Sequence, residues 1–227
     1  MPTALITGAG RGLGLEFARQ YAADRWRVIG TVRDAKGKAA LAKLGANVKS
    51  RRLDVTDRKQ VARLAAGLKG IPIDVLILNA GVYGPKGARF GKLDYRAWEE
   101  VIRVNVLGPA AVADALIENV AASERRTIVM ISSRLGSIAE NRGDGDLPYN
   151  TSKSALNALA KGLAVALRSR GIVVVAMSPG WVRTDMGGRS APLAPEESIG
   201  RLRKLIGGFT REHSGRFISH DGSGIPW

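Results

Sequence analysis

The stretch TALITGAGRGLG, residues 3–14, decides the fold that the rest of the chain has to complete. Its first five residues are apolar or β-branched and predict a short buried strand. Gly8, Gly12 and Gly14 follow, and a helical pattern begins at about residue 13. Glycines between a strand and a helix let the backbone approach a pyrophosphate at the positive end of that helix. The stretch therefore favours a nucleotide-binding turn over a merely flexible one, although its G-x-x-x-G-x-G spacing departs from the commoner G-x-G-x-x-G.

The rest of the chain alternates between strand-like and helical patterns. A nearly unbroken apolar strand followed by an amphipathic helix, repeated along a chain, is typical of a parallel sheet covered on both faces. We therefore predict an α/β fold, with a single doubly wound Rossmann-type domain over residues 1–227 and a mostly parallel seven-stranded sheet. The predicted strands are 3–7, 27–32, 48–53, 73–79, 126–132, 172–178 and a weak 216–219; the predicted helices are 13–24, 35–45, 57–68, 94–119, 149–169 and 195–206.

Composition bounds the possible functions. The 227 residues are 45% hydrophobic and 24% charged, which is ordinary for a globular protein with one core. There is no cysteine, and His213 and His220 have no cluster of further ligands around them in the sequence, so we expect no metal site. A strand at residue 3 leaves no room for a signal peptide, and no apolar run is long enough to span a membrane. We expect a cytoplasmic protein with no membrane partner.

The net charge of +15 is the one unusual property of the composition. Such a charge suggests an anionic partner, for example nucleic acid. The basic residues are spread along the chain, however, and the clusters at 51–52, 125–126 and 201–204 are short. We therefore interpret the charge as a solvated basic surface and expect no nucleic-acid partner.

Polar residues gather where the predicted strands end, which is where parallel sheets bind ligands. Asp54 could accept a hydrogen bond from an adenine amino group or belong to the turn that caps the next helix. The small residues of 79–81 would let the chain pass close to a ribose, and the loop 83–85 could form one wall of a cleft. Asn105 is a lone polar residue in an apolar helical run. It must be satisfied either by a helix irregularity and water or by a water of a proton relay.

Tyr149 and Lys153 are four residues apart at the start of a predicted helix, so their side chains would share one face. A neighbouring ammonium favours the phenolate and lowers the phenol's pKa from its usual value of about 10. A hydroxyl from Ser133 could stabilise the oxygen on which charge develops during proton transfer. Because neighbouring side chains of a strand face opposite ways, Ser132 and Ser133 would not serve this site equally.

These motifs together resemble the short-chain dehydrogenase/reductase family over essentially the whole chain. TGAGRGLG at 7–14, NAG at 79–81, Asn105, Ser133, YNTSK at 149–153 and PG at 179–180 occur in the family's order. ISSRLGSI at 131–138, SPGWVRTDMGG at 178–188 and APEES at 194–198 are similar to its C-factor and sniffer-like carbonyl reductase branch. The interval from Ser133 to Tyr149 is a few residues longer than is usual in the family. We predict that the extra residues, within 141–146, form a surface loop.

The resemblance implies a role for each matching residue. Tyr149 would donate the proton in reduction, Lys153 would lower its pKa and hold the nicotinamide ribose, Ser133 would orient the substrate carbonyl, and Asn105 would position a water linking Lys153 to solvent. The cofactor-binding residues implied in the same way are Gly8, Arg11, Gly12, Leu13, Gly14, Arg33, Asp54, Val55, Asn79, Ala80, Gly81, Tyr149, Lys153, Pro179, Gly180, Val182 and Thr184.

The residues after the second predicted strand indicate which nicotinamide cofactor is used. NAD enzymes place a carboxylate there for the ribose hydroxyls, whereas NADP enzymes place an arginine near the 2′-phosphate. The strand ends at Val32, Arg33 comes next, and Asp34 is interpreted as the start of the turn or cap that follows. Arg11 could reach the same phosphate and complete a two-arginine clamp. We predict NADP, with NAD as the alternative.

The predicted function is an oxidoreductase that transfers hydride between NADP(H) and a carbonyl or alcohol carbon of a small substrate. The alternative is a nucleotide-binding signalling or regulatory protein on the same fold with little turnover. Trp181, Val182 and Met186 indicate a partly apolar pocket, and Arg134 could meet an anionic substrate or simply face solvent. Apolar residues cover more than one stripe of the helices at 94–119 and 155–167, so we expect a homodimer or homotetramer.

Overall fold

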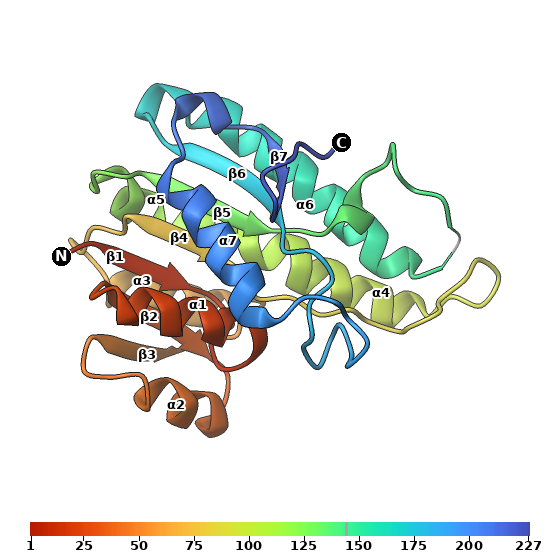
Figure 1. Ribbon diagram of the computed structural model, residues 1–227. Helices are drawn as coiled ribbons and strands as arrows, with labels where there is room; N and C mark the ends of the chain where they lie inside the picture. The colour runs from red at the N-terminus through yellow and green to blue at the C-terminus, as the bar shows by residue number, and fades with distance from the viewer. Residues whose placement is uncertain (144) are drawn as a thin grey trace.

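A computed structural model describes residues 1–143 and 145–227. One sheet runs through the middle of the molecule, with its strands in the order β3-β2-β1-β4-β5-β6-β7 (Figure 1). Every pairing between neighbouring strands is parallel. The predicted seven-stranded sheet is thus confirmed, and it is wholly parallel in the described part. The strands are β1 Thr3–Ile6, β2 Arg27–Val32, β3 Val48–Arg52, β4 Val75–Leu78, β5 Thr127–Ile131, β6 Val173–Ser178 and β7 Phe217–Ser219.

The strands are buried on both faces, and each face packs into its own hydrophobic core. Successive side chains of a strand alternate between the faces, so Leu5 joins one core while Ile6 joins the other. Helices α3, α5 and α6 contribute to the first core, and α1, α2 and α7 to the second. The helices are α1 Gly12–Ala23, α2 Ala35–Ala42, α3 Arg58–Ala66, α4 Tyr95–Ile102, α5 Gly108–Ala121, α6 Leu147–Ala166 and α7 Pro195–Gly207, with short 3₁₀ turns at Arg134–Gly136, Arg168–Arg170 and Arg211–His213.

The helix predicted over 94–119 is divided by a π-helical segment, Arg103–Leu107, between α4 and α5. Asn105 lies inside this segment and is buried. Gly108 follows, and a Cβ there would lie 2.6 Å from the side chain of Val55. Pro109 stands in the first turn of α5, directly after this segment. Single π turns inside α-helices are frequent at functional sites.

Strand order reverses beside β1, which lies between β2 and β4. Ligands bind doubly wound sheets outside the carboxyl ends of the strands at this point. The loops after β1, β2, β4, β5 and β6 emerge at that edge, and they carry most of the predicted site residues. Residues 141–143 of the predicted surface loop are exposed, and residue 144 lies outside the described residues. In the part of the chain that is described, no helix combines the length and apolarity that a bilayer span requires.

Candidate active site

The glycine loop after β1 is shaped by close backbone contacts. Gly8 and Gly12 have φ angles of +67° and +51°, in the region that glycine enters most readily. A Cβ on Gly14 would overlap the carbonyl oxygen of Gly8 and lie 2.6 Å from Nδ2 of Asn79. Leu13 packs against the core and anchors the start of α1. The loop therefore leaves its backbone free to approach a ligand at the N-terminus of α1, as a pyrophosphate site requires.

Asn79 and Thr7 fasten this loop to the end of β4. Nδ2 of Asn79 donates to the carbonyls of Thr7 (3.0 Å) and Gly8 (3.3 Å). The Thr7 hydroxyl accepts from the backbone N–H groups of Asn79 (2.9 Å) and Ala80 (3.0 Å). The Asn79 side chain is thus engaged in building the site. Gly81 lies deeper, where a Cβ would be 3.8 Å from Nζ of Lys153.

Two roles were left open for Asp54, an adenine contact and a place in the turn that caps the next helix. The cap itself is Asp57. Asp57 caps α3 by accepting from the backbone N–H groups of Lys59 and Gln60. Asp54 instead accepts from the backbone N–H (2.9 Å) and hydroxyl (2.7 Å) of Thr56, and these bonds lower its pKa below the usual value. Asp54 is therefore held as a carboxylate at the sheet edge, next to the buried Val55.

A hollow of about 430 Å³ opens beside the end of β2, lined by Val32, Arg33, Asp34, Ala35, Lys38, Ser50 and Arg52. The carboxylate of Asp34 accepts from the backbone N–H of Gly37 at 2.8 Å and so caps α2, as predicted. The lining side chains of Arg33, Lys38 and Arg52 are cationic. This set of donors fits a phosphate ester on the adenosine ribose.

Sequence analysis missed Lys38 and Arg52. Lys38 lies one helical turn after the cap Asp34. Arg52 enters the hollow because β3 pairs with β2 so that Arg52 lies opposite Val32. That register was not predicted, although Arg52 was noted as part of a short basic cluster.

Arg11 differs from its predicted place. It does not line the hollow; Nη1 lies 3.2 Å from the carboxylate of Asp185, in the loop after β6, and both side chains are exposed. The two-arginine clamp of Arg33 and Arg11 remains a prediction, since the exposed Arg11 side chain pairs with Asp185 in this structure.

Tyr149 and Lys153 project from the first turns of α6, and both are buried. Burial raises the pKa of Tyr149 to about 12, and a hydrogen bond with Ser133 opposes part of this rise. Burial lowers the pKa of Lys153 to about 8. Its Nζ donates to the carbonyl of Ile131 at 2.9 Å and lies 5.5 Å from the centre of the Tyr149 ring. The sequence predicted that Lys153 lowers the Tyr149 pKa. In this structure burial is the largest effect on both groups, and it raises the Tyr149 pKa instead.

The two adjacent serines face opposite ways, as predicted. Ser132 is buried, and its hydroxyl donates to Oδ1 of Asn157 at 2.6 Å. Ser133 lies at the partly open side, where its hydroxyl meets the phenol of Tyr149 and accepts from the backbone N–H of Leu135 at 3.2 Å. Ser133 is therefore the serine that lies beside Tyr149.

The side chain of Asn105 is satisfied within the protein. Oδ1 accepts from the backbone N–H of Val82 (2.8 Å), and Nδ2 donates to the carbonyl of Val82 (2.8 Å) and the hydroxyl of Ser152 (3.0 Å). The side chain thus joins the loop after β4 to α6. The helix irregularity that the sequence suggested is present, and the relay role remains a prediction.

The loop after β6 closes the opposite side of the site. The carbonyl of Pro179 accepts from Ser198 in α7 at 2.7 Å, and Gly180 has a φ of +79° against Leu193. Val182 is buried and forms an isolated β-bridge with Leu193, which joins the two ends of the loop. Thr184 faces the glycine loop, where a Cβ on Gly12 would lie 3.7 Å from its methyl group. Trp181 and Met186 remain exposed.

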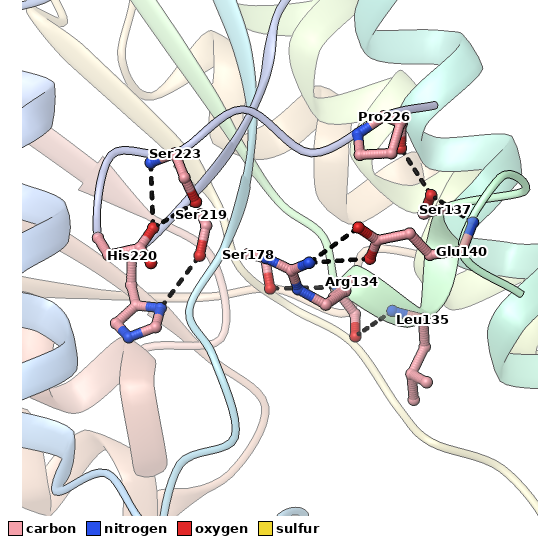
Figure 2. Close-up of polar contacts among 11 residues, drawn as sticks. Arg134, Leu135, Ser137, Glu140, Ser178, Ser219, His220, Ser223 and Pro226 are labelled. Atoms are coloured by element: carbon pink, nitrogen blue, oxygen red, sulfur yellow. Dashed lines mark hydrogen bonds and ion pairs between the residues drawn. The ribbon is translucent and has the colours of Figure 1, made fainter.

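Figure 2 shows how the loop that follows Ser133 is held. Nη1 of Arg134 is 2.9 Å from both carboxylate oxygens of Glu140, and the backbone N–H of Arg134 donates to Ser178 at 3.1 Å. Ser137 donates to the carbonyl of Pro226 at 2.6 Å, which fixes the chain's last residues to the same loop. Arg134 is thus paired with Glu140 while its side chain stays 52% exposed, and a role toward an anionic substrate remains a prediction.

Tyr83 also belongs to this constellation, beyond the cleft-wall role suggested for its loop. Its ring stacks on that of Tyr149, with centroids 4.3 Å apart and an interplanar angle of 20°. Its hydroxyl donates to the carboxylate of Asp146 at 2.8 Å. Neither partner could be identified from the sequence, because the two segments are far apart in the chain.

A parallel sheet in the order found here, a glycine turn after β1, and buried Tyr149 and Lys153 beside Ser133 at the sheet edge are typical of a nucleotide-dependent enzyme class. The family model described as short chain dehydrogenase matches residues 2–192. The chain belongs to this family, and its recognition from sequence is confirmed.

One curated relative and two solved structures show which members of the family this chain resembles. C-signal of Myxococcus xanthus is 40% identical over 156 residues, which cover 69% of this chain and 93% of the relative. The carbonyl reductase Sniffer of D. melanogaster superposes with a TM-score of 0.93 at 33% identity, covering 100% of both chains. An NADPH-bound carbonyl reductase from chicken fatty liver gives 0.92 at 30% identity, covering 100% of this chain and 99% of the other. These similarities agree with the predicted C-factor and sniffer-like branch.

Proposed function

We propose that this protein is an NADP(H)-dependent carbonyl reductase in which Tyr149 exchanges a proton with the substrate oxygen. The observation that carries the proposal is the buried Tyr149 beside Ser133 and Lys153, on the sheet edge that also holds the glycine loop. Bound NADPH would supply the hydride for the carbonyl carbon.

Each residue of the chain then has a definite task. With a pKa near 12, the Tyr149 phenol is protonated at neutral pH and is a donor to the carbonyl oxygen as negative charge develops there. Ser133 supplies a second hydrogen bond to the same oxygen. Lys153, with a pKa near 8, is mainly cationic at neutral pH and places its charge beside the phenol and ribose. That charge would favour phenolate when Tyr149 gives up its proton.

NADP is favoured over NAD by the hollow beside β2. Its three cations suit a dianionic 2′-phosphate, while Asp34, the acid that could accept from ribose hydroxyls, is bonded to the backbone of α2. The chicken fatty liver enzyme, similar over the full chain, is described as NADPH-bound.

The substrate is proposed to be a small carbonyl compound of apolar character. Leu135 and Ile138 are exposed on the loop that follows Ser133, and Trp181 and Met186 on the loop that follows β6. Apolar side chains on the two loops that border the site favour a hydrocarbon substituent over a charged one. Arg134 is paired with Glu140 at 2.9 Å, which makes its charge less available to an anion.

A test of this function is NADPH oxidation across a panel of small aldehydes and ketones, comparing wild type with Tyr149→Phe. We expect turnover by the wild type and almost none by the variant, with unchanged NADPH affinity in both. No turnover of any panel member despite tight NADPH binding would favour the signalling alternative, which the similarity to C-signal keeps in view.

A second copy of this chain is the partner we propose for the apolar helix surfaces. Val165 on α6 is 69% exposed and Leu107 before α5 is 46% exposed. Large exposed apolar side chains on neighbouring helices are typical of subunit contacts. Light scattering on wild type, Leu107→Glu and Val165→Glu tests this: we expect a dimer or tetramer that at least one charge substitution dissociates, and a monomeric wild type would contradict it.

A further inference from the structure

The Tyr83 ring covers one face of Tyr149. The centroid separation of 4.3 Å and angle of 20° are those of a stacked pair. Tyr83 lies in the loop after β4, whereas Tyr149 lies in α6. The loop is fixed just before Tyr83, because Val82 exchanges two backbone hydrogen bonds with the side chain of Asn105. These two hydrogen bonds therefore fix the backbone next to Tyr83.

Asp146 ties the same loop to the start of α6. Its Oδ2 accepts from the Tyr83 hydroxyl, and its Oδ1 accepts from the backbone N–H of Gly87, both at 2.8 Å. Asp146 immediately precedes α6 and lies three residues before Tyr149. A single carboxylate thus joins the loop that carries the stacking ring to the helix that carries the stacked one.

The state of the Tyr83 hydroxyl suits this link. Burial, followed by the hydrogen bond to Asp146, raises the pKa of Tyr83 well above the usual range, so the hydroxyl remains a donor at all ordinary pH values. Lys86 lies over the Tyr83 ring, with Nζ 5.9 Å from the centroid. The Tyr83 phenol is therefore the donor of this contact, and the Asp146 side chain is its acceptor.

We propose that Tyr83 is a positioning residue for Tyr149, and that its hydrogen bond to Asp146 latches the Tyr83 ring in place. The inference rests on the proposed role of Tyr149 as proton donor. The stacked ring restricts Tyr149 to one orientation, in which its hydroxyl meets Ser133, and leaves the substrate carbonyl to approach from the uncovered side. Small displacements of a reacting group lower rates by up to about a hundredfold.

Four variants separate the ring from the latch. Tyr83→Ala removes both, and Tyr83→Phe keeps the ring but loses the hydroxyl. Asp146→Gly removes the carboxylate while accepting the φ of +58° at this position, and Asp146→Asn keeps an amide oxygen for Gly87. The matched controls are Tyr95→Phe and Asp94→Asn. Tyr95 is exposed, and Asp94 caps α4 by accepting from the backbone N–H of Ala97.

The measurements are kcat and KM with a small and a bulky carbonyl substrate, NADPH affinity by fluorescence, and thermal unfolding. We expect Tyr83→Ala to lower kcat about tenfold or more for both substrates, with NADPH affinity within about twofold of wild type. Tyr83→Phe should recover only part of this loss, Asp146→Gly should resemble or fall below Tyr83→Phe, and the controls should match wild type.

Two outcomes would overturn the inference. Unchanged kcat in folded Tyr83→Ala would exclude a positioning role, as would a change confined to KM of the bulky substrate, which would make Tyr83 only a pocket wall. If Tyr83→Ala fails to fold, equal kcat in Asp146→Gly and wild type would have the same force.

Failure of this inference can be told apart from failure of the proposed function. Substantial turnover by Tyr149→Phe would remove the proton-donor role itself. An inactive Tyr149→Phe together with a fully active Tyr83→Ala would remove only the positioning role. In a double-mutant cycle, Tyr83→Ala should cause little further loss in the Tyr149→Phe background, because the two residues act through one oxygen.

Discussion

Arg52 on β3 lies directly opposite Val32 on β2, so its side chain enters the hollow that begins where β2 ends. This register adds Arg52 to the two other cations of the hollow, Arg33 and Lys38. We therefore expect cofactor preference to depend on Arg33, Lys38 and Arg52 jointly.

Removing one of these cations should weaken NADPH use selectively. For Arg33→Ala and Arg52→Ala we expect kcat/KM with NADPH to fall about ten- to a hundredfold, because a hydrogen bond to a charged group contributes about 1.5–3 kcal/mol. Values with NADH should change little. Arg11→Ala is the matched control: it lies outside the hollow and pairs with Asp185 on the surface, so it should keep the NADPH preference. A wild type that uses NADH as well as NADPH would contradict the assignment.

Tyr149→Phe should reduce kcat by about 10²- to 10⁴-fold, the usual contribution of a positioned acid or base. The phenylalanine ring can still stack on Tyr83, so NADPH affinity and the melting temperature should remain close to wild type. Stopped-flow NADPH oxidation and fluorescence titration measure the two quantities. Retention of more than about half of kcat would remove Tyr149 from the chemistry.

Ser132 and Ser133 should show opposite profiles when each is changed to alanine. Ser133→Ala removes the hydroxyl that meets Tyr149, and we expect kcat/KM to fall by about tenfold or more with little effect on unfolding. Ser132→Ala leaves the buried Oδ1 of Asn157 without its donor, which should cost about 1–3 kcal/mol of stability. Its kcat/KM should be the less affected of the two. The reverse ranking in parallel assays would show that the wrong serine has been assigned.

Stability should depend on pH through Lys153. Its pKa is about 8 in the folded protein against the usual 10.5 of a lysine, so between these values the unfolded chain binds more protons. The free energy of unfolding therefore gains a contribution that rises with pH through this window. The Tyr149 pKa is raised from 10.0 to about 12, which opposes the trend only above pH 10. Urea unfolding between pH 7 and 9.5 should show the rise in wild type and its loss in Lys153→Met; parallel curves would contradict it.

Much of the fold could be predicted because apolar strands and amphipathic helices carry local signals. The seven strands start and end within two residues of their predicted bounds. The break at residues 103–107 was not predicted as a π segment, since it depends on Asn105 bonding to Val82 and Ser152 from other elements. Local periodicity contains no information about such partners.

The residues of the candidate site also divide into those with a local sequence signal and those placed by distant partners. Gly8, Ser133, Tyr149 and Lys153 lie in short motifs with their own spacing, so they could be named from the sequence. Tyr83 and Arg52 are placed by partners from other elements, and the ion pair of Arg11 with Asp185 joins residues 174 positions apart. Contacts set by strand register and loop docking required the structure.

The attachment of Pro226 and Trp227 to the loop after Ser133 has a consequence for synthesis. Ser137 donates to the carbonyl of Pro226, and the backbone N–H of Ala139 donates to that of Trp227 at 3.0 Å. Strands β1 to β6 can pair before these residues leave the ribosome, whereas the serine loop gains both bonds only afterwards. During translation, then, strands β1 to β6 can pair first, and a nascent chain short of residue 226 would carry that scaffold before the loop after Ser133 has gained these two bonds.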